Sequence, residues 1–141
     1  MSLKLNDKET TTVAVPNATT SGALTATAIN ATGYGRARFV FNFGSNAGGA
    51  SVAAAGIGIY QASSSGATYS SISTAVLAAI SSGALSNQVA VIDTVISSGT
   101  PWLEVSGAVV NSSIIVGATV DLYNGTAKLP FTALEQQVVS V

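Results

Sequence analysis

Apolar and polar residues alternate most regularly along the stretch from Trp102 to Phe131. Asn124-Gly125 lies within it, and both residues tolerate the positive φ angles that a two-residue type I′ hairpin turn requires. Pairing outward from this turn places apolar residues opposite one another on one face and sets Asp121 opposite Lys128 on the other. The stretch therefore predicts a β-hairpin centred on Asn124-Gly125.

The same alternation continues backwards toward Trp102. A turn at Asn111-Ser112 would add a third antiparallel strand, and the apolar face would remain continuous, an agreement that a one-residue register shift would destroy. The predicted inner layer consists of Leu103, Val105, Val109, Ile114, Val116, Ala118, Val120, Leu122, Ala127, Leu129 and Phe131. We therefore expect a three-stranded meander that forms one wall of a sandwich core.

A second alternating stretch runs from Arg36 to Phe43. Its phenylalanines share one face with Ala37, and large aromatic side chains on one strand face are typical of a core. Arg36 and Arg38 lie together on the opposite face. They are either two solvated charges or a small basic contact for an acidic partner surface, which paired guanidinium groups fit well.

The rest of the chain predicts mostly short strands separated by turns rich in Gly, Pro, Asn and Ser. These strands are expected around Val13 and Val15 and at Leu24–Ile29, Val52–Tyr60 and Asn87–Ile96. The segment Ser73–Ile80 carries apolar residues at helical spacing and predicts a short helix. We therefore expect an all-β, antiparallel β-sandwich with at most one short helix, near residues 73–80.

The two ends of the chain differ in character from its middle. Residues 1–12 carry charges without periodicity and predict an extended or mobile N-terminal arm, which could also clasp a neighbouring subunit. A single domain is expected over residues 13–141, because the chain of 141 residues is long enough for one core.

Glycines interrupt the strand predicted at Val52–Tyr60. Alternation places Ile57 and Ile59 on one face together with Ala53 and Ala55, and it leaves Gly56 and Gly58 on the other. A bulge, a ligand or a neighbouring backbone would each explain these glycines, and a packed side chain from an opposing sheet is the commonest reason.

Composition narrows the function classes. The chain is 48% apolar but only 8% charged, against about 25% in ordinary soluble domains, so its surface repels neighbours poorly and suits a subunit of a larger assembly. A net charge of −1 cannot supply the electrostatic footprint of a nucleic-acid-binding protein. The N-terminus shows no signal peptide and no run is long enough for a membrane helix, so we expect synthesis in the cytoplasm and no membrane partner.

Candidate chemistry is sparse. Without Cys or His, zinc sites and imidazole catalysis are excluded, and no cofactor motif stands at a strand–helix junction. Asp93 is expected to point outward from its strand. Glu104 would lie diagonal to Asp121 in the predicted meander, close enough for a two-carboxylate site, but pairing of Asp121 with Lys128 explains the aspartate more simply. We expect no enzyme.

Trp102 is the clearest sign of a partner contact. In the predicted meander it lies on the outer face with Val110 and Ile115, and apolar residues there indicate either contact with another subunit or packing under a terminal arm of the same chain. In a carbohydrate-binding module, Trp102, Tyr34, Tyr60 or Tyr69 would serve instead as stacking platforms for sugars.

The succession GYGRARFVFNFG, SSSGATYSSI and LEVSGAVVNSSIIVGATVDLYNGT resembles head decoration (cement) proteins of tailed bacteriophages over roughly residues 33–130. The resemblance implies a β-sandwich or jelly-roll-like domain, commonly a homotrimer. It further implies a virion protein that binds the major capsid protein on the capsid exterior and reinforces the shell without catalysis or a cofactor.

Overall fold

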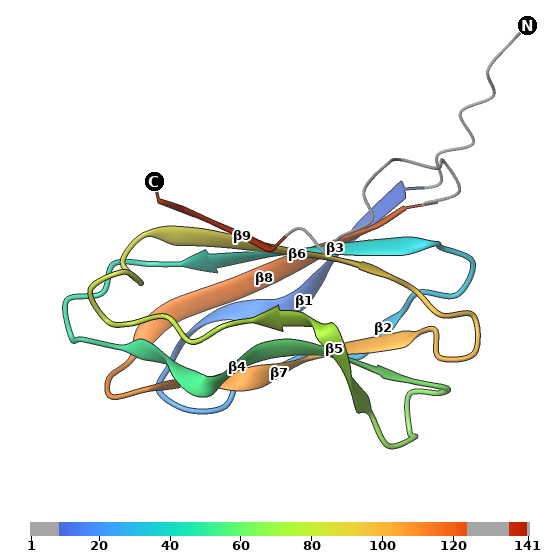
Figure 1. Ribbon diagram of the computed structural model, residues 1–141, viewed down its shortest axis with the longest axis horizontal. Helices are drawn as coiled ribbons and strands as arrows, with labels where there is room; N and C mark the ends of the chain where they lie inside the picture. The colour runs from blue at the N-terminus through green and yellow to red at the C-terminus, as the bar shows by residue number, and fades with distance from the viewer. Residues whose placement is uncertain (1–8, 124–135, 141) are drawn as a thin grey trace, which may run out of the picture.

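The computed structural model describes residues 9–123 and 136–140, which form two antiparallel β-sheets packed face to face (Figure 1). The first sheet contains β1 (Glu9–Thr20), β3 (Arg36–Phe43), β6 (Gln88–Val95), β8 (Ile114–Tyr123) and β9 (Gln136–Ser140). The second sheet contains β2 (Ile29–Asn30), β4 (Ser51–Ala62), β5 (Ser70–Leu77) and β7 (Trp102–Val110). The predicted all-β sandwich is confirmed.

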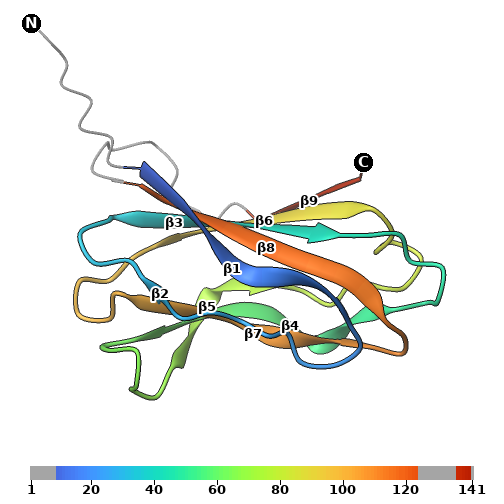
Figure 2. The ribbon, with the colours of Figure 1, turned by 180° about the vertical axis from the view of Figure 1, so that it is seen from behind.

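The strand order is that of a jelly roll. The order is β1-β8-β3-β6-β9 in the first sheet and β2-β7-β4-β5 in the second. The antiparallel pairs β4·β5, β3·β6, β2·β7 and β1·β8 are therefore nested, as if one long hairpin had been rolled into a sandwich. Figure 2, seen from behind, shows β1 running beside β8 at one edge of the first sheet.

The core lies between the inner faces of the two sheets. Phe39 and Phe41 of β3 are fully buried, and from the second sheet Ile57, Ile59 and Leu103 are fully buried as well. Strict alternation in Arg36–Phe43 produces this arrangement, because successive side chains of a strand point to opposite faces. Both the bounds and the buried face of β3 agree with the sequence prediction.

The predicted meander is wrong, although its buried face is right. The described members of the predicted inner layer, from Leu103 to Leu122, are all buried. However, β7 belongs to the second sheet and β8 to the first, because the turn at Asn111, whose φ is 72°, carries the chain across the sandwich. Alternation determines which side chains face the core, and it does not determine which strand lies alongside.

Other strands lie on both sides of β8. Along most of its length β8 pairs with β1 on one side and with β3 on the other. Asn124-Gly125 and the strand predicted after it lie outside the described residues, as does Lys128.

Three other elements differ from their predictions. Ser73–Ile80 is not a helix: Ser70–Leu77 forms β5 and pairs with β4, because a short apolar run follows its tertiary surroundings more than its own spacing. Of the strand expected at Leu24–Ile29, only Ile29 lies in a strand, as the first residue of β2, and Ala23 just before this stretch forms an isolated bridge with Ala108. The first strand, β1, begins at Glu9, inside the predicted arm of residues 1–12.

A bulge in β4 divides the face predicted for that strand: Ile57 and Ile59 face the core, opposite Gly58 as predicted, whereas Ala53 and Ala55 lie on the outer face. Between Val52 and Ile57 the register against β7 shifts, and Gly56 adopts a φ of 78°, which favours glycine. Val52 and Ile57 are both buried although they are five positions apart, whereas Ala55 is exposed. The bulge was one of the explanations left open for the glycines of this strand.

Candidate interaction surfaces

Four polar side chains form a network on the outer face of the first sheet, which we call the Asp93 cluster: Arg36, Arg38, Asp93 and Tyr123. The register brings them together, because β3 lies between β6 and β8, with Arg38 opposite Asp93 on one side and Arg36 opposite Tyr123 on the other. Sequence alternation places all four on the outer face.

Asp93 is the centre of this cluster. Its Oδ1 accepts from Arg36 Nε at 3.0 Å and forms an ion pair with Arg36 Nη2 at 2.9 Å, while its Oδ2 accepts from the Tyr123 hydroxyl and lies 3.4 Å from Arg38 Nε. The predicted outward direction of Asp93 is right, but the residue is only 8% exposed. A carboxylate this buried needs such partners, because an unpaired one would lose its solvation without compensation.

The Tyr123 hydroxyl both donates and accepts a hydrogen bond within the cluster. Its hydroxyl donates to Asp93 and accepts from Arg36 Nε at 3.1 Å. Burial of the hydroxyl, together with its hydrogen bond to Asp93, raises the pKa of Tyr123 above its ordinary value. Sequence reasoning did not single out Tyr123, although its place two residues after Asp121 puts it on the outer face.

The two arginines have different roles. The Arg36 side chain is held by Asp93 and Tyr123. The Arg38 side chain is 52% exposed, and its guanidinium lies 5.6 Å from the centroid of the Tyr123 ring. The expected basic contact for an acidic partner therefore rests mainly on Arg38, and binding by either arginine stays a prediction.

A row of apolar side chains crosses the first sheet beside the cluster. Val13, Val40 and Val91, with Thr119 between the first two, lie in register on neighbouring strands, and we call this set the valine row. Val13 is 50% exposed, and Val40 and Val91 are half-buried. The outer face thus combines apolar area with one accessible cation.

The structure does not bring Trp102, Val110 and Ile115 together. Trp102 and Val110 lie at opposite ends of β7 in the second sheet, whereas Ile115 lies on β8 in the first sheet. Val110 and Ile115 are exposed and Trp102 is half-buried. The three residues remain predicted partner contacts, but they cannot form one patch.

The two carboxylates of the predicted pair lie in different sheets. Glu104 is on β7 and pairs in register with Tyr60, while Asp121 is on β8 and accepts a hydrogen bond from Thr11 Oγ1 at 2.6 Å. Both alternate with buried neighbours and so lie on the outer faces of their own sheets, on opposite sides of the sandwich. The suggested two-carboxylate site therefore does not form.

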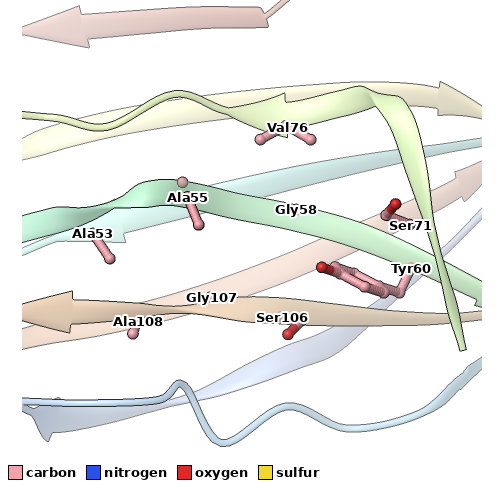
Figure 3. Close-up of a pocket in the computed structure, with 10 residues that line it drawn as sticks. Ala53, Ala55, Gly58, Tyr60, Ser71, Val76, Ser106, Gly107 and Ala108 are labelled. Carbon is pink, nitrogen blue, oxygen red and sulfur yellow. The ribbon is translucent and has the colours of Figure 1, made fainter.

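The outer face of the second sheet is hollowed by a depression of about 240 Å³ (Figure 3). Most of its lining is small, and we call it the Tyr60 depression after its one aromatic side chain. It is lined by Ala53, Ala55, Gly56, Gly58, Tyr60, Ser71, Val76, Ser106, Gly107 and Ala108. These residues come from β4, β5 and β7.

Glycines let the strands and the Tyr60 ring approach closely. A Cβ at Gly107 would lie 2.8 Å from the Cα of Ile57, and one at Gly58 would lie 3.3 Å from Cε2 of Tyr60. The Tyr60 ring therefore passes beside Gly58, and Figure 3 shows it extending along the strands, with Ser71 and Ser106 on either side. In the sequence, Gly56 and Gly58 indicated a close approach at this site. Nothing in the sequence indicated that Ser71 and Ser106 would line it.

Tyr69 does not line the depression. Its hydroxyl oxygen is buried and has no hydrogen-bond partner among the described residues. Burial, followed by the negative charge of Glu104, raises the pKa of Tyr69.

Within residues 9–123 and 136–140, no three acidic side chains gather in a way that could hold a metal ion. The same part of the chain contains no helix that could span a membrane.

In comparisons with known proteins, no family model, no curated protein and no solved structure matches this chain.

Proposed function

We propose that this chain is a structural subunit that binds the exterior of a phage capsid through the outer face of its first sheet and reinforces the shell. One observation carries the proposal. Of the four large apolar side chains exposed among the described residues, three lie on this face, namely Val13, Val95 and Ile115. Val13 continues into the half-buried Val40 and Val91 through the valine row, and contiguous apolar area of this kind marks interaction surfaces, whereas singly exposed residues do not.

The strand edges support docking through a face. Proteins protect sheet edges with bulges, proline or very short strands, because free edges recruit other chains. Here β1 has two register shifts and contains Pro16, β2 is two residues long, and β5 has a register shift against β4. The β9 edge is five residues long. Three of the four edges are therefore protected against pairing, which favours an outer face as the contact surface.

The accessible cation suits an acidic position on the partner. Arg38 is half-exposed beside the valine row and is already oriented by Asp93 and the Tyr123 ring. A carboxylate of the major capsid protein would meet a guanidinium with reduced rotational freedom, which lowers the entropy lost on binding. Arginine beside apolar area is also a typical composition for an interface core.

The architecture is compatible with this role by analogy only. Jelly rolls occur in viral capsid proteins and in lectin domains, and one fold serves many functions. The resemblance to phage decoration proteins, with its homotrimer and its place on the virion, is part of the same proposal.

Co-sedimentation with phage heads assembled without this chain tests the proposal. We expect the wild-type chain to sediment with the heads and both Val91→Lys and Arg38→Glu to bind at least about tenfold more weakly, as central interface residues do. Ser73→Lys, an exposed substitution in the second sheet, is the matched control and should bind normally. Folding of each variant is checked by its melting temperature.

Two results would contradict the proposal: a wild-type chain that stays in the supernatant, or variants of the first sheet that bind as well as Ser73→Lys. Light scattering on the free chain tests the homotrimer separately, and the mass of a monomer would exclude it.

A further inference from the structure

The Tyr60 depression combines an aromatic ring with free hydroxyls. The Tyr60 side chain is half-buried, with Gly58 beside the ring. Ser71 and Ser106 line the depression with exposed side chains, and neither hydroxyl has a hydrogen-bond partner among the described residues. The remaining lining is apolar and, apart from Val76, small, so a ligand would find one stacking surface and a few hydrogen-bonding groups.

Size limits the ligand to a single ring. The volume of about 240 Å³ lies below the roughly 300–1,000 Å³ of pockets that enclose drug-sized molecules. The depression also lies on the surface of a sheet, so a longer ligand could continue outward from it.

Charge further limits the class of ligand. The cations of the described residues, Arg36 and Arg38, both lie on the opposite outer face, so no positive charge of the described second sheet faces the depression. Glu104, opposite Tyr60 in the register, adds a negative charge nearby. A phosphate or a carboxylate would therefore be repelled, whereas a neutral ligand would not.

We propose that the Tyr60 depression binds one pyranose ring of a neutral saccharide, stacked against the ring of Tyr60. The C–H groups on one side of such a sugar form an apolar face that suits an aromatic ring, and its hydroxyls match those of Ser71 and Ser106. Of the aromatic residues considered as platforms from the sequence, only Tyr60 lines the depression, and Trp102, Tyr34 and Tyr69 do not. The site lies on the sheet opposite the proposed capsid contact and does not depend on it.

Titration of the full-length chain with methyl glycosides tests this assignment. The probes are the neutral methyl glycosides of glucose, galactose, mannose and N-acetylglucosamine, followed by backbone amide NMR shifts, with methyl glucuronide as the anionic probe. We expect saturable shifts around the depression for at least one neutral probe and weaker binding of the glucuronide.

Variants connect the binding to the site. Tyr60→Ala should weaken binding about tenfold or more, because it removes the stacking surface, whereas Tyr60→Phe keeps the ring and should change affinity less than about threefold. Ser106→Ala should weaken binding, and Ser98→Ala, at an exposed serine between β6 and β7 that does not line the depression, should leave it unchanged. Melting temperatures confirm that the variants are folded, and the two mild variants test the site even if Tyr60→Ala does not fold.

Three results would overturn the proposal: no saturable shift with any neutral glycoside, tighter binding of the glucuronide, or affinity that is unchanged in both Tyr60→Ala and Ser106→Ala. Failure of capsid binding would not bear on this result, because the substitutions that test capsid binding lie on the first sheet.

Discussion

The outer face of the first sheet is filled by long side chains, whereas the outer face of the second sheet is hollowed by small ones. In the Asp93 cluster, two arginines and a tyrosine surround a carboxylate and link β3, β6 and β8. In the Tyr60 depression, glycines at 56, 58 and 107 bring backbones close together and leave space above them. Hydrogen bonds and ion pairs between side chains link the strands on the first face, whereas glycines allow close approach of backbones on the second. Different substitutions should therefore destabilise the two faces.

The largest effect is expected where the second sheet depends on backbone proximity. Gly56 has a φ of 78°, and a Cβ there would overlap the carbonyl oxygen of Leu77. A left-handed backbone costs a non-glycine residue about 1–2 kcal/mol and overpacking about 1–3 kcal/mol, so Gly56→Ala should lower the free energy of unfolding by about 3 kcal/mol. Urea denaturation followed by circular dichroism measures the loss.

Gly83→Ala is the control for this substitution. A Cβ at Gly83 meets no atom within 4 Å, and the residue has no positive φ. Its unfolding free energy should change by less than about 0.5 kcal/mol, as for ordinary surface substitutions. Equal losses in the two variants would show that neither the left-handed φ of Gly56 nor its close approach to Leu77 requires a glycine there.

The first sheet should be most sensitive at Asp93. Asp93→Ala leaves Arg36 without its carboxylate partner. Removing one member of a buried ion pair lowers the free energy of unfolding by about 3–5 kcal/mol. We expect a smaller loss of about 2 kcal/mol here, because the Arg38 side chain is half-exposed to water. Thermal unfolding measures the effect. Arg38→Ala, which removes the exposed member, should cost less than about 1 kcal/mol. A larger loss in Arg38→Ala than in Asp93→Ala would contradict the central place of Asp93.

The sequence predicted most successfully what depends on local alternation. Arg36–Phe43 was expected as a strand with its phenylalanines inward, and it forms β3 with these bounds and this buried face. The inner face of β7 and β8 was likewise right, because the side-chain period of two is a property of the strand itself.

Pairing between distant segments was not predictable in the same way. In a jelly roll the partners of β8 are β1 and β3, which are remote in sequence, and alternation carries no information about them. For this reason the sequence did not predict the Asp93 cluster, because Asp93 of β6 and Tyr123 of β8 come together only across β3. Alternation indicated the glycines of the Tyr60 depression, but it could not place Ala53 and Ala55 there, because the bulge in β4 moves them to the outer face.

Two tyrosines allow a matched comparison of the two faces. The Tyr123 hydroxyl donates to Asp93, so Tyr123→Phe should lower the unfolding free energy by about 1–2 kcal/mol, somewhat less than the value of a buried hydrogen bond to a charged group. The Tyr69 hydroxyl is buried without a partner in the described part of the chain, so Tyr69→Phe should leave stability unchanged or raise it by up to about 1 kcal/mol. Denaturant midpoints distinguish these outcomes, and destabilisation by Tyr69→Phe alone would reverse the comparison.

The smallest effect is expected from alkaline titration of the same two residues. The pKa of each tyrosine is raised in the folded chain, by burial and the hydrogen bond to Asp93 for Tyr123 and by burial and Glu104 for Tyr69. The folded state therefore favours the protonated phenol, and this stabilisation is fully present below the unfolded pKa of about 10 and is lost as the pH rises through the folded pKa. The free energy of unfolding lost at high pH should be smaller than the loss caused by Tyr123→Phe. A Tyr123 phenolate could no longer donate a hydrogen bond to Asp93, but it would bind the Arg36 guanidinium more strongly. Unfolding free energies measured from pH 8 upward should fall less steeply in the Tyr69→Phe/Tyr123→Phe double variant than in the wild type, and equal slopes would show that neither hydroxyl is coupled to folding.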